Sequence, residues 1–461
     1  MRPGSTLIVT FDGLRRDRAI PELMPNLAGF IAEGADFTFS RSVFPSETRV
    51  CISSLVTGCP PAAHGVVANA FIHRAAVPDR VFNTARQEDL RAAAALGLLL
   101  DRPSLGERLA AAGEALAVVS TGTPGATMMM NHRAAALGHF VFSAHGPAAS
   151  IPAAAAEAAI ARFGPIPPAG TPNTARLDYA VRVLTELVYP DLSPALAILW
   201  FSDPDSTCHR FGIRGAETED CMRGADAAFG RLLQWWRASP DGRPDNILVM
   251  SDHGHITGRT EIDVAALLPE LGSELVPGYV SSVHFREPAP ERQAALVRHL
   301  AQQPWCGLIL TPGGVAGSLD LAAVGGGHAR AADVVFTLAA ADDTCLFSGG
   351  IGPGGGIHGG LQAGELSTVL AGCGPAFATG RKTALPCWLP DIAPTVLHVL
   401  GLPHDGTVGR VLTEGLAVPA GDPPVFGRRE LETVIGTHHQ GLHQWTHGAV
   451  AITERGWSRP A

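Results

Sequence analysis

Three short runs of apolar residues predict buried strands. They are TLIVTF at 6–11, ALAILWF at 195–201 and NILVM at 246–250. A strand that is covered on both faces needs apolar side chains at successive positions, as in a parallel sheet between two layers of helices. The pattern therefore favours an α/β fold with a mostly parallel central sheet flanked by helices.

A carboxylate follows each of these runs. Asp12 comes directly after the first run, Asp205 and His209 follow the second, and Asp252 and His253 follow the third. Because the carboxyl ends of parallel strands meet at one edge of a sheet, we expect these side chains to lie close together. Taken alone, Asp12 is equally well explained as a turn residue before a glycine.

The stretch FPSETRVCISSLVT at 44–57 predicts a turn followed by a helix that ends near Gly58. Thr48 would lie in the first helical turn, where unpaired backbone N–H groups and the helix dipole favour an anion. Considered by itself, the pattern is more simply explained if Ser46 or Thr48 caps the helix. The role of Thr48 therefore depends on the groups that surround it.

Other segments predict further elements of the same fold. Residues 24–34 have the spacing of a short amphipathic helix, and residues 389–400 have that of a second helix. Residues 35–43 and 366–371 are typical of strands. These elements would complete the layers on and around the central sheet.

Between residues 256 and 345 the pattern weakens into short apolar pieces separated by glycine-rich loops. We interpret this segment as an inserted lid or cap region. The predicted organisation is a catalytic core at 1–255 and 346–415, the inserted region at 256–345, and a C-terminal extension at 416–461.

Composition narrows the class of protein. The 461-residue chain is 46% hydrophobic and 17% charged, which fits a compact enzyme. Its net charge of -9 provides no broad cationic surface, so a nucleic acid polymer is not expected as a partner. The eight cysteines form no C-x-x-C pair, which argues against a disulfide framework or a cysteine zinc site. A homo-oligomer is possible.

The sequence also predicts where the protein resides. No apolar run approaches the ~18 to 20 residues needed to cross a bilayer, so no membrane partner is expected. The first strand begins at Thr6, which leaves no room for the apolar core of a signal peptide. We therefore expect a cytoplasmic protein.

Several short motifs follow one another in a fixed order. Together they resemble the alkaline phosphatase superfamily, in particular its nucleotide pyrophosphatase/phosphodiesterase branch and the related phosphonoacetate hydrolases. The resemblance extends from residue 6 to about residue 410 and includes DIAPTVLHVLGLP at 391–403. The motifs are DG at 12–13, FPSET at 44–48, TG at 57–58, HG at 64–65 leading to Asn69, PDSTCH at 204–209, SDHG at 251–254 and IHGG at 357–360.

The resemblance implies an alkaline phosphatase-like core that binds two divalent metal ions. Oxygen and imidazole ligands in this mixture suit zinc, although manganese or iron could occupy the same groups. Thr48 would be the nucleophile that forms a covalent phospho-threonine intermediate, and Asn69 would bind the oxyanion. One ion would be held by Asp12, Thr48, Asp252 and His253, and the other by Asp205, His209 and His358.

The chain departs from the family pattern near the nucleophile. Glu47 and Arg49 flank Thr48, where nucleotide-cleaving members usually have a lysine and an aromatic residue. We expect Arg49 to bind a negatively charged part of the substrate, with a solvated surface arginine as an equal alternative. His255 replaces a residue that is often apolar. It is predicted as a substrate contact, with a locally hydrogen-bonded or ligand-supporting histidine as the alternative.

These features predict a two-metal phosphohydrolase that acts on a small-molecule phosphoester or phosphonate. Cleavage of phosphate diesters or related phosphonates is the first expectation. Phosphonoacetate-type C–P bond hydrolysis is the second, since Arg49 could pair with a substrate carboxylate. A phosphate monoesterase is the third, and a catalytically silent binding protein on the same fold is the alternative from another class.

Overall fold

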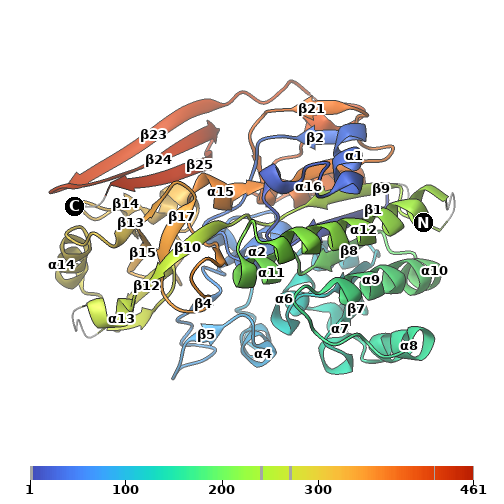
Figure 1. The fold of residues 1–461 in the computed structure, drawn as a ribbon, viewed down its shortest axis with the longest axis horizontal. Coiled ribbons are helices and arrows are strands. Elements are labelled where there is room, and N and C mark those ends of the chain that lie inside the picture. Colours follow the sequence, from blue (N-terminus) through green and yellow to red (C-terminus); the bar gives the residue numbers. More distant parts are fainter. Residues whose placement is uncertain (1–3, 239–241, 269–272, 420, 460–461) are drawn as a thin grey trace.

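The computed structural model describes residues 4–238, 242–268, 273–419 and 421–459. An eight-stranded sheet with the order β21-β2-β20-β9-β1-β8-β6-β7 forms its centre (Figure 1). The five strands from β9 to β7 in this order are parallel, and β20 is antiparallel to β9. This confirms the predicted mostly parallel sheet. The strands are β1 Thr6–Phe11, β2 Ala35–Phe37, β6 Leu116–Ser120, β7 Phe140–Ser143, β8 Leu196–Phe201, β9 Asn246–Met250, β20 Leu370–Cys373 and β21 Arg381–Thr383.

The three apolar runs form adjacent strands in the middle of this sheet. β1 pairs with β8 on one side and with β9 on the other, and Thr6 is in register with both Leu196 and Asn246. All residues of these three strands are buried. Their carboxyl ends therefore lie side by side, as the sequence predicted.

Helices cover both faces of the sheet because its strands are apolar on both sides. On β1, Ile8 faces one cluster of buried residues, whereas Leu7 and Val9 face another. Each fully buried aliphatic side chain contributes about 1.5–3 kcal/mol to folding. The first cluster includes α2 Thr48–Thr57, α5 Leu105–Ala111, α6 Pro124–Met130 and α16 Ile392–Val399, and the second includes α1 Pro25–Glu33, α9 Thr174–Val183 and α12 Ala216–Ala238.

Two predicted strands are wrong in extent. Residues 35–43 divide into β2 and β3 Ser40–Arg41, and residues 366–371 divide into β19 Ser367–Thr368 and β20. β3 and β19 pair in a separate small sheet, where the hydroxyls of Ser40 and Thr368 lie 2.7 Å apart. A run of apolar and small residues does not show where the chain passes from one sheet to another. The division of each run into two strands could therefore not be predicted from the sequence.

Strands between residues 256 and 357 form two further sheets beside the central sheet, to its left in Figure 1. The first has the order β16-β17-β10-β18, and the second has the order β11-β12-β15-β13-β14. The predicted end of the inserted region at residue 345 falls inside β17. The limits of the domains stay a prediction. The strands are β10 Ile256–Glu261, β11 Ser273–Val276, β12 Val280–Phe285, β13 Cys306–Thr311, β14 Leu319–Asp320, β15 Val334–Leu338, β16 Ala340–Ala341, β17 Thr344–Phe347 and β18 Gly356–Ile357.

The last part of the chain is an antiparallel sheet of β23 Gly427–Ile435, β24 His438–His447 and β25 Val450–Arg459. It runs above the second sheet in Figure 1. Gln440 accepts a 2.7 Å hydrogen bond from the backbone of Ile309, and Leu442 is fully buried. The segment therefore packs on the rest of the chain.

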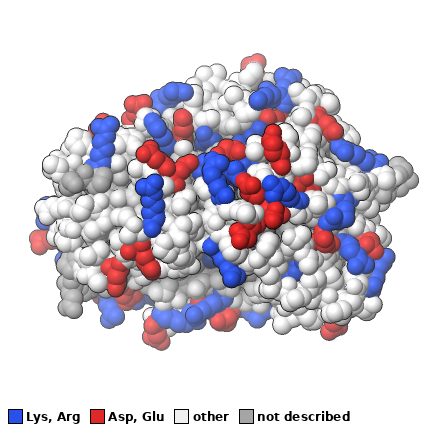
Figure 2. All heavy atoms as spheres, in the orientation of Figure 1, with Lys and Arg blue, Asp and Glu red and all other residues white. Residues whose placement is uncertain are grey.

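The described surface carries mixed charge. On the face shown in Figure 2, acidic and basic side chains are interspersed. No helix in the described ranges is long and apolar enough to cross a membrane. All eight cysteines are buried and unpaired.

Gly58 provides a test of how α2 ends. Its φ of +67° is left-handed, and a Cβ there would lie 2.9 Å from Thr407 Cγ2. Gly97 has a similar φ of +69° but no heavy atom within 4 Å of its Cβ position. Gly58→Ala should therefore lower the free energy of unfolding by about 1 kcal/mol more than Gly97→Ala, measured by denaturant titration. Equal losses would show that the contact with Thr407 relaxes without cost.

Candidate active site

Three carboxylates meet at the carboxyl ends of the central strands. Asp12 follows β1, Asp252 follows β9, and Asp205 is the first residue of α11 Asp205–Phe211, shortly after β8. The backbone N–H of Asp205 donates to the carbonyl of Asp12 at 2.9 Å, which fixes the start of α11 against the end of β1. Asp12 and Asp252 are almost fully buried.

His253 lies at the centre of the first group of predicted ligands. Its Nε2 is 3.5 Å from Asp12 Oδ1, 3.4 Å from Asp252 Oδ2 and 3.2 Å from Thr48 Oγ1. Thr48 is the first residue of α2. The structure thus brings together all four residues that the resemblance assigns to one ion.

Each of the two buried carboxylates has one oxygen that is held and one that is free. Asp12 Oδ2 accepts a 2.9 Å hydrogen bond from Trp200 Nε1, and Asp252 Oδ1 accepts a 3.0 Å bond from Gly13 N. Among the described residues, Asp12 Oδ1 and Asp252 Oδ2 are buried without a hydrogen-bond partner. A buried acceptor without a partner costs about 1–3 kcal/mol, and more if it is charged. Two such oxygens beside an imidazole and a hydroxyl fit a divalent cation.

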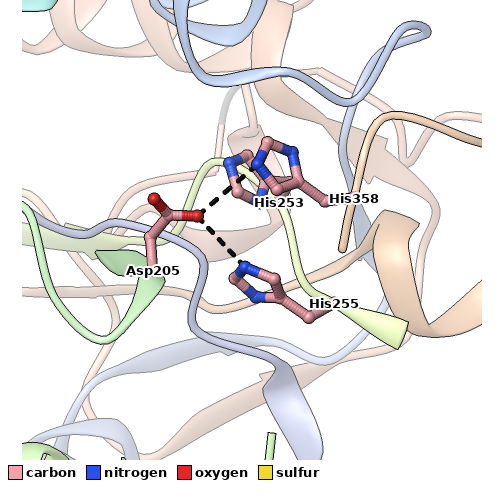
Figure 3. Close-up of side chains that lie close together, drawn as sticks. All are labelled: Asp205, His253, His255 and His358. Carbon is pink, nitrogen blue, oxygen red and sulfur yellow. Dashed lines mark hydrogen bonds and ion pairs between the residues drawn. The ribbon is translucent and has the colours of Figure 1, made fainter. Parts of the chain in front are cut away.

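The second group gathers around one oxygen of Asp205. Asp205 Oδ1 is 3.3 Å from His209 Nε2, 3.5 Å from His358 Nε2 and 3.0 Å from His255 Nε2. His209 lies one helical turn after Asp205 on α11. Side chains four residues apart on a helix lie on the same face, so both can reach one ion. Figure 3 shows the rings of His255 and His358 directed at this oxygen, with His253 stacked on His358.

Backbone carbonyls orient the imidazoles. His209 Nδ1 lies 2.8 Å from Gly356 O, and His358 Nδ1 lies 2.7 Å from Ser46 O. A carbonyl can only accept, so each Nδ1 carries a proton and each Nε2 is directed toward Asp205. Metal-binding histidines are commonly held in this way.

Burial makes the carboxylates difficult to ionise without a cation. It raises the pKa of Asp12 well above the usual range, and the charges of Asp252 and Asp205 raise it further. Burial and the charge of Asp205 raise the pKa of Asp252 to about 7. Burial also lowers the pKa of His253 to about 3, so this imidazole is neutral. Bound divalent cations would favour the ionised carboxylates and the neutral imidazole.

The pair formed by Asp205 and His209 behaves differently. Burial opposes the charge of His209, but the adjacent Asp205 carboxylate outweighs it and raises the pKa of His209 to about 9. Burial likewise opposes the charge of Asp205, but His209 holds the pKa of this carboxyl well below its usual range. In the absence of a metal ion these two residues therefore form an ion pair.

The start of α2 is held by Asn69. Its side-chain oxygen accepts a 3.1 Å hydrogen bond from the backbone N–H of Arg49, and its own backbone N–H donates to the Glu47 carboxylate. Within the described ranges the side-chain NH2 group of Asn69 donates no hydrogen bond, so this group is available as a donor. Glu47 is the N-cap but makes no side-chain capping bond, and Ser46 Oγ bonds Gly360 O instead. The capping alternative for Ser46 and Thr48 is wrong.

The structure also locates the two predicted substrate contacts. Arg49 is partly buried, and its Nε donates to Thr84 Oγ1 at 3.2 Å. Its charge acts on Asp12, Asp205 and Asp252. His255 is fully buried against Asp205, among the predicted metal ligands. A substrate-binding role for either residue stays a prediction.

A cavity of about 470 Å³ opens beside the site. Its wall includes Phe44, Glu47, Asn69 and His358 from the core, together with residues between 276 and 335. Sequence reasoning did not identify this wall, because its members come from short segments without a periodic pattern. It also did not identify Trp200 as the hydrogen-bond donor to Asp12. The signal for this role is that an indole N–H in a buried strand needs an acceptor.

Comparison with known proteins gives consistent matches. The family model described as "Type I phosphodiesterase / nucleotide pyrophosphatase" matches residues 6–303. "Ectonucleotide pyrophosphatase/phosphodiesterase family member 7" of Rattus norvegicus is 26% identical over 253 residues, which is 54% of this chain and 50% of that protein. The Homo sapiens protein of the same name is 26% identical over 253 residues, 54% of this chain and 48% of that protein.

A shorter match involves "Bis(5'-adenosyl)-triphosphatase ENPP4" of Pongo abelii, which is 34% identical over 87 residues, 19% of each chain. The chain spans about half the length of the family member 7 proteins that it matches. Six of the seven predicted metal ligands lie within residues 6–303, and His358 lies beyond them.

The crowding of buried carboxylates predicts that chelation lowers thermal stability. An ion at a free concentration of ~100 Kd stabilises the folded state by about 2.7 kcal/mol, so treatment with a chelator should lower Tm measurably in calorimetry. Asp252→Asn is the matched control. It removes one buried charge, so its Tm should fall less on chelation, and its metal-free form should be at least as stable as the metal-free wild type. An unchanged wild-type Tm after chelation would contradict metal binding.

Proposed function

The chain belongs to the type I phosphodiesterase/nucleotide pyrophosphatase family, and on this basis we propose that it is a metal-dependent hydrolase of small-molecule phosphate diesters. The observation that carries the proposal is the position of Thr48. Its hydroxyl lies at the start of α2, 3.2 Å from His253 Nε2 and beside the two buried carboxylate oxygens that lack partners. A hydroxyl in this position is suited to act as a nucleophile.

Two divalent ions, with zinc as the proposed metal, would occupy the two groups of ligands. When bound, they would lower the pKa of a hydroxyl and neutralise charge on a phosphoryl group. The donor atoms fit this role because nitrogen and carboxylate oxygen predominate. Asp12, Thr48, Asp252 and His253 would hold one ion, and Asp205, His209 and His358 would hold the other.

The reaction proceeds in two displacements at phosphorus. Thr48 Oγ loses its proton and attacks phosphorus, a Thr–O–P bond forms, and the bond from phosphorus to the leaving oxygen breaks, so that this oxygen takes up a proton and leaves as an alcohol. Water then cleaves the Thr–O–P bond, which releases a monoester and restores the Thr48 hydroxyl. The amino group of Asn69 and the backbone N–H of Thr48 are the proposed donors to a non-bridging oxygen.

The cavity beside Thr48 indicates what kind of organic group the substrate carries. Its volume of about 470 Å³ is in the range of small-molecule sites. Most of its wall is apolar, and no lysine or arginine is among the described residues that line it. Glu47 is the carboxylate in this wall, and burial raises its pKa. An uncharged organic arm of a diester fits this cavity better than an anionic group.

Arg49 is a second group next to the nucleophile. It flanks Thr48 but does not line the cavity, and its charge acts on Asp12, Asp205 and Asp252. We infer that its guanidinium pairs with a non-bridging phosphoryl oxygen. The same position supports the second candidate, phosphonoacetate-type hydrolysis, in which Arg49 would pair with the substrate carboxylate. The size and apolar character of the cavity favour the diester.

The division of the cavity wall supports a cap function. Residues between 276 and 335 line part of the cavity, and residues of the core, several of them near Thr48, line the rest. We propose that 256–345 acts as a cap on the core formed by 1–255 and 346–415, with 416–461 as an extension. The cap would then select the organic arm, and the core would carry the reaction.

Replacement of the nucleophile tests the reaction. Thr48→Ala should lower kcat/KM for bis(p-nitrophenyl) phosphate by at least about 10³-fold, because it removes the attacking oxygen. Zinc content should remain near that of the wild type, and Thr48→Ser should retain more activity than Thr48→Ala. Near wild-type rates for Thr48→Ala would exclude the covalent route. Rates on p-nitrophenyl phosphate and phosphonoacetate, measured in parallel, would identify a monoesterase or a C–P hydrolase.

Replacement of Arg49 tests the anion contact. A charge-assisted hydrogen bond contributes about 1.5–3 kcal/mol, so Arg49→Ala should lower kcat/KM for the best substrate between about tenfold and a hundredfold. Arg91→Ala, at an exposed position on α4 Gln87–Ala95, is the control and should leave kcat/KM unchanged. If kcat/KM of both variants equals that of the wild type, the proposed contact between Arg49 and the substrate is refuted.

A further inference from the structure

We propose that His255 is an additional imidazole ligand of the metal ion at Asp205, alongside His209 and His358. The proposal rests on the metal site proposed above and changes its composition. With His255 included, this ion has four protein ligands in place of three.

The position of His255 is fixed on both sides of its ring. The side chain is fully buried at the end of the loop from β9 to β10. A Cβ on Gly13 would lie 2.3 Å from His255 Cε1, and a Cβ on Gly356 would lie 3.1 Å from its Cδ2. Gly13 has a φ of +70°, so a glycine there serves both the turn and the close approach of the ring. The ring is thus confined to one orientation.

That orientation places two acceptors against each other. His255 Nδ1 lies 2.9 Å from Gly13 O, and a carbonyl can only accept, so Nδ1 carries the proton of the neutral ring. Nε2 then presents a lone pair to Asp205 Oδ1 at 3.0 Å. A lone pair and a carboxylate oxygen repel each other unless a proton or a cation lies between them.

His255 shares this arrangement with the two other histidines around Asp205. His209 and His358 also give Nδ1 to backbone carbonyls, and their Nε2 atoms lie 3.3 and 3.5 Å from the same oxygen. One proton can satisfy only one of these three contacts. The ligand atoms of Asp205, His255 and His358 all lie within 4.8 Å of one another, so one divalent cation near the oxygen can accept the lone pairs of His255 and His358 together, which one proton cannot do.

The directions of the rings suit one ion. The centroid of His255 lies 5.4 Å from that of His209 and 5.2 Å from that of His358, with interplanar angles of 83° and 80°. Figure 3 shows the contacts from His255 and His358 meeting at Asp205 from different sides. Imidazole nitrogen and carboxylate oxygen are donors that zinc accepts in four-coordinate tetrahedral sites, and cobalt binds donors of the same kind.

Proton NMR of the cobalt-loaded protein tests this proposal without an activity assay. An imidazole bound to Co²⁺ through Nε2 gives one strongly shifted, exchangeable Nδ1–H signal. Since His253 is proposed for the other ion and also bonds a carbonyl through Nδ1, the wild type should show four such signals. His255→Gln should lose one of them, and His73→Gln, at a buried histidine elsewhere, should lose none.

Each result has a defined meaning. Three signals in the wild-type protein, all retained in His255→Gln, would overturn the proposal and place His255 behind the ligands as a positioning residue. The wild-type count decides this even if the variant does not fold. A wild-type protein that binds no cobalt would instead refute the proposed two-metal function itself.

Discussion

Asp12, Asp205 and Asp252 lie at neighbouring strand ends, where burial and mutual repulsion oppose their ionisation. The central sheet creates this crowding because β8, β1 and β9 are adjacent, parallel and in register. The surrounding residues partly compensate for this repulsion. Trp200 and Gly13 satisfy one oxygen each, imidazoles face the others, and Arg49 supplies the nearby positive charge. Bound cations would complete the charge balance that the protein groups begin.

Much of this arrangement could be predicted from the sequence. The strands were predictable because apolar residues at every position have few explanations other than burial on both faces. The gathering of their terminal carboxylates followed from the geometry of parallel sheets. The helix at 48–57 and its end at Gly58 were also predictable, since a left-handed glycine commonly terminates a helix. These features depend on local pattern or on a general rule of topology.

Other features depend on contacts between distant segments and left no local signal. The break between β2 and β3 depends on pairing with β19, more than 300 positions away. The cavity wall depends on how residues 276–350 pack against the core. His255 was predicted as a substrate contact from its place in a motif, but its neighbour is Asp205 from another strand end. Sequence reasoning therefore predicted the residues proposed for catalysis and metal binding better than it predicted the cavity wall that would select a substrate.

The long separations within the site have a consequence for how the protein matures. The hydrogen bond from Gly13 to Asp252 joins positions 239 apart, and that from His358 to Ser46 joins positions 312 apart. Contacts between such distant positions require large loops to close, and a metal site made from them cannot exist in a local fragment. During synthesis, the ligand set would stay incomplete until residue 358 has left the ribosome. Metal uptake would therefore require segments from both ends of this span to be assembled, and the binding energy would stabilise their association and not any one segment.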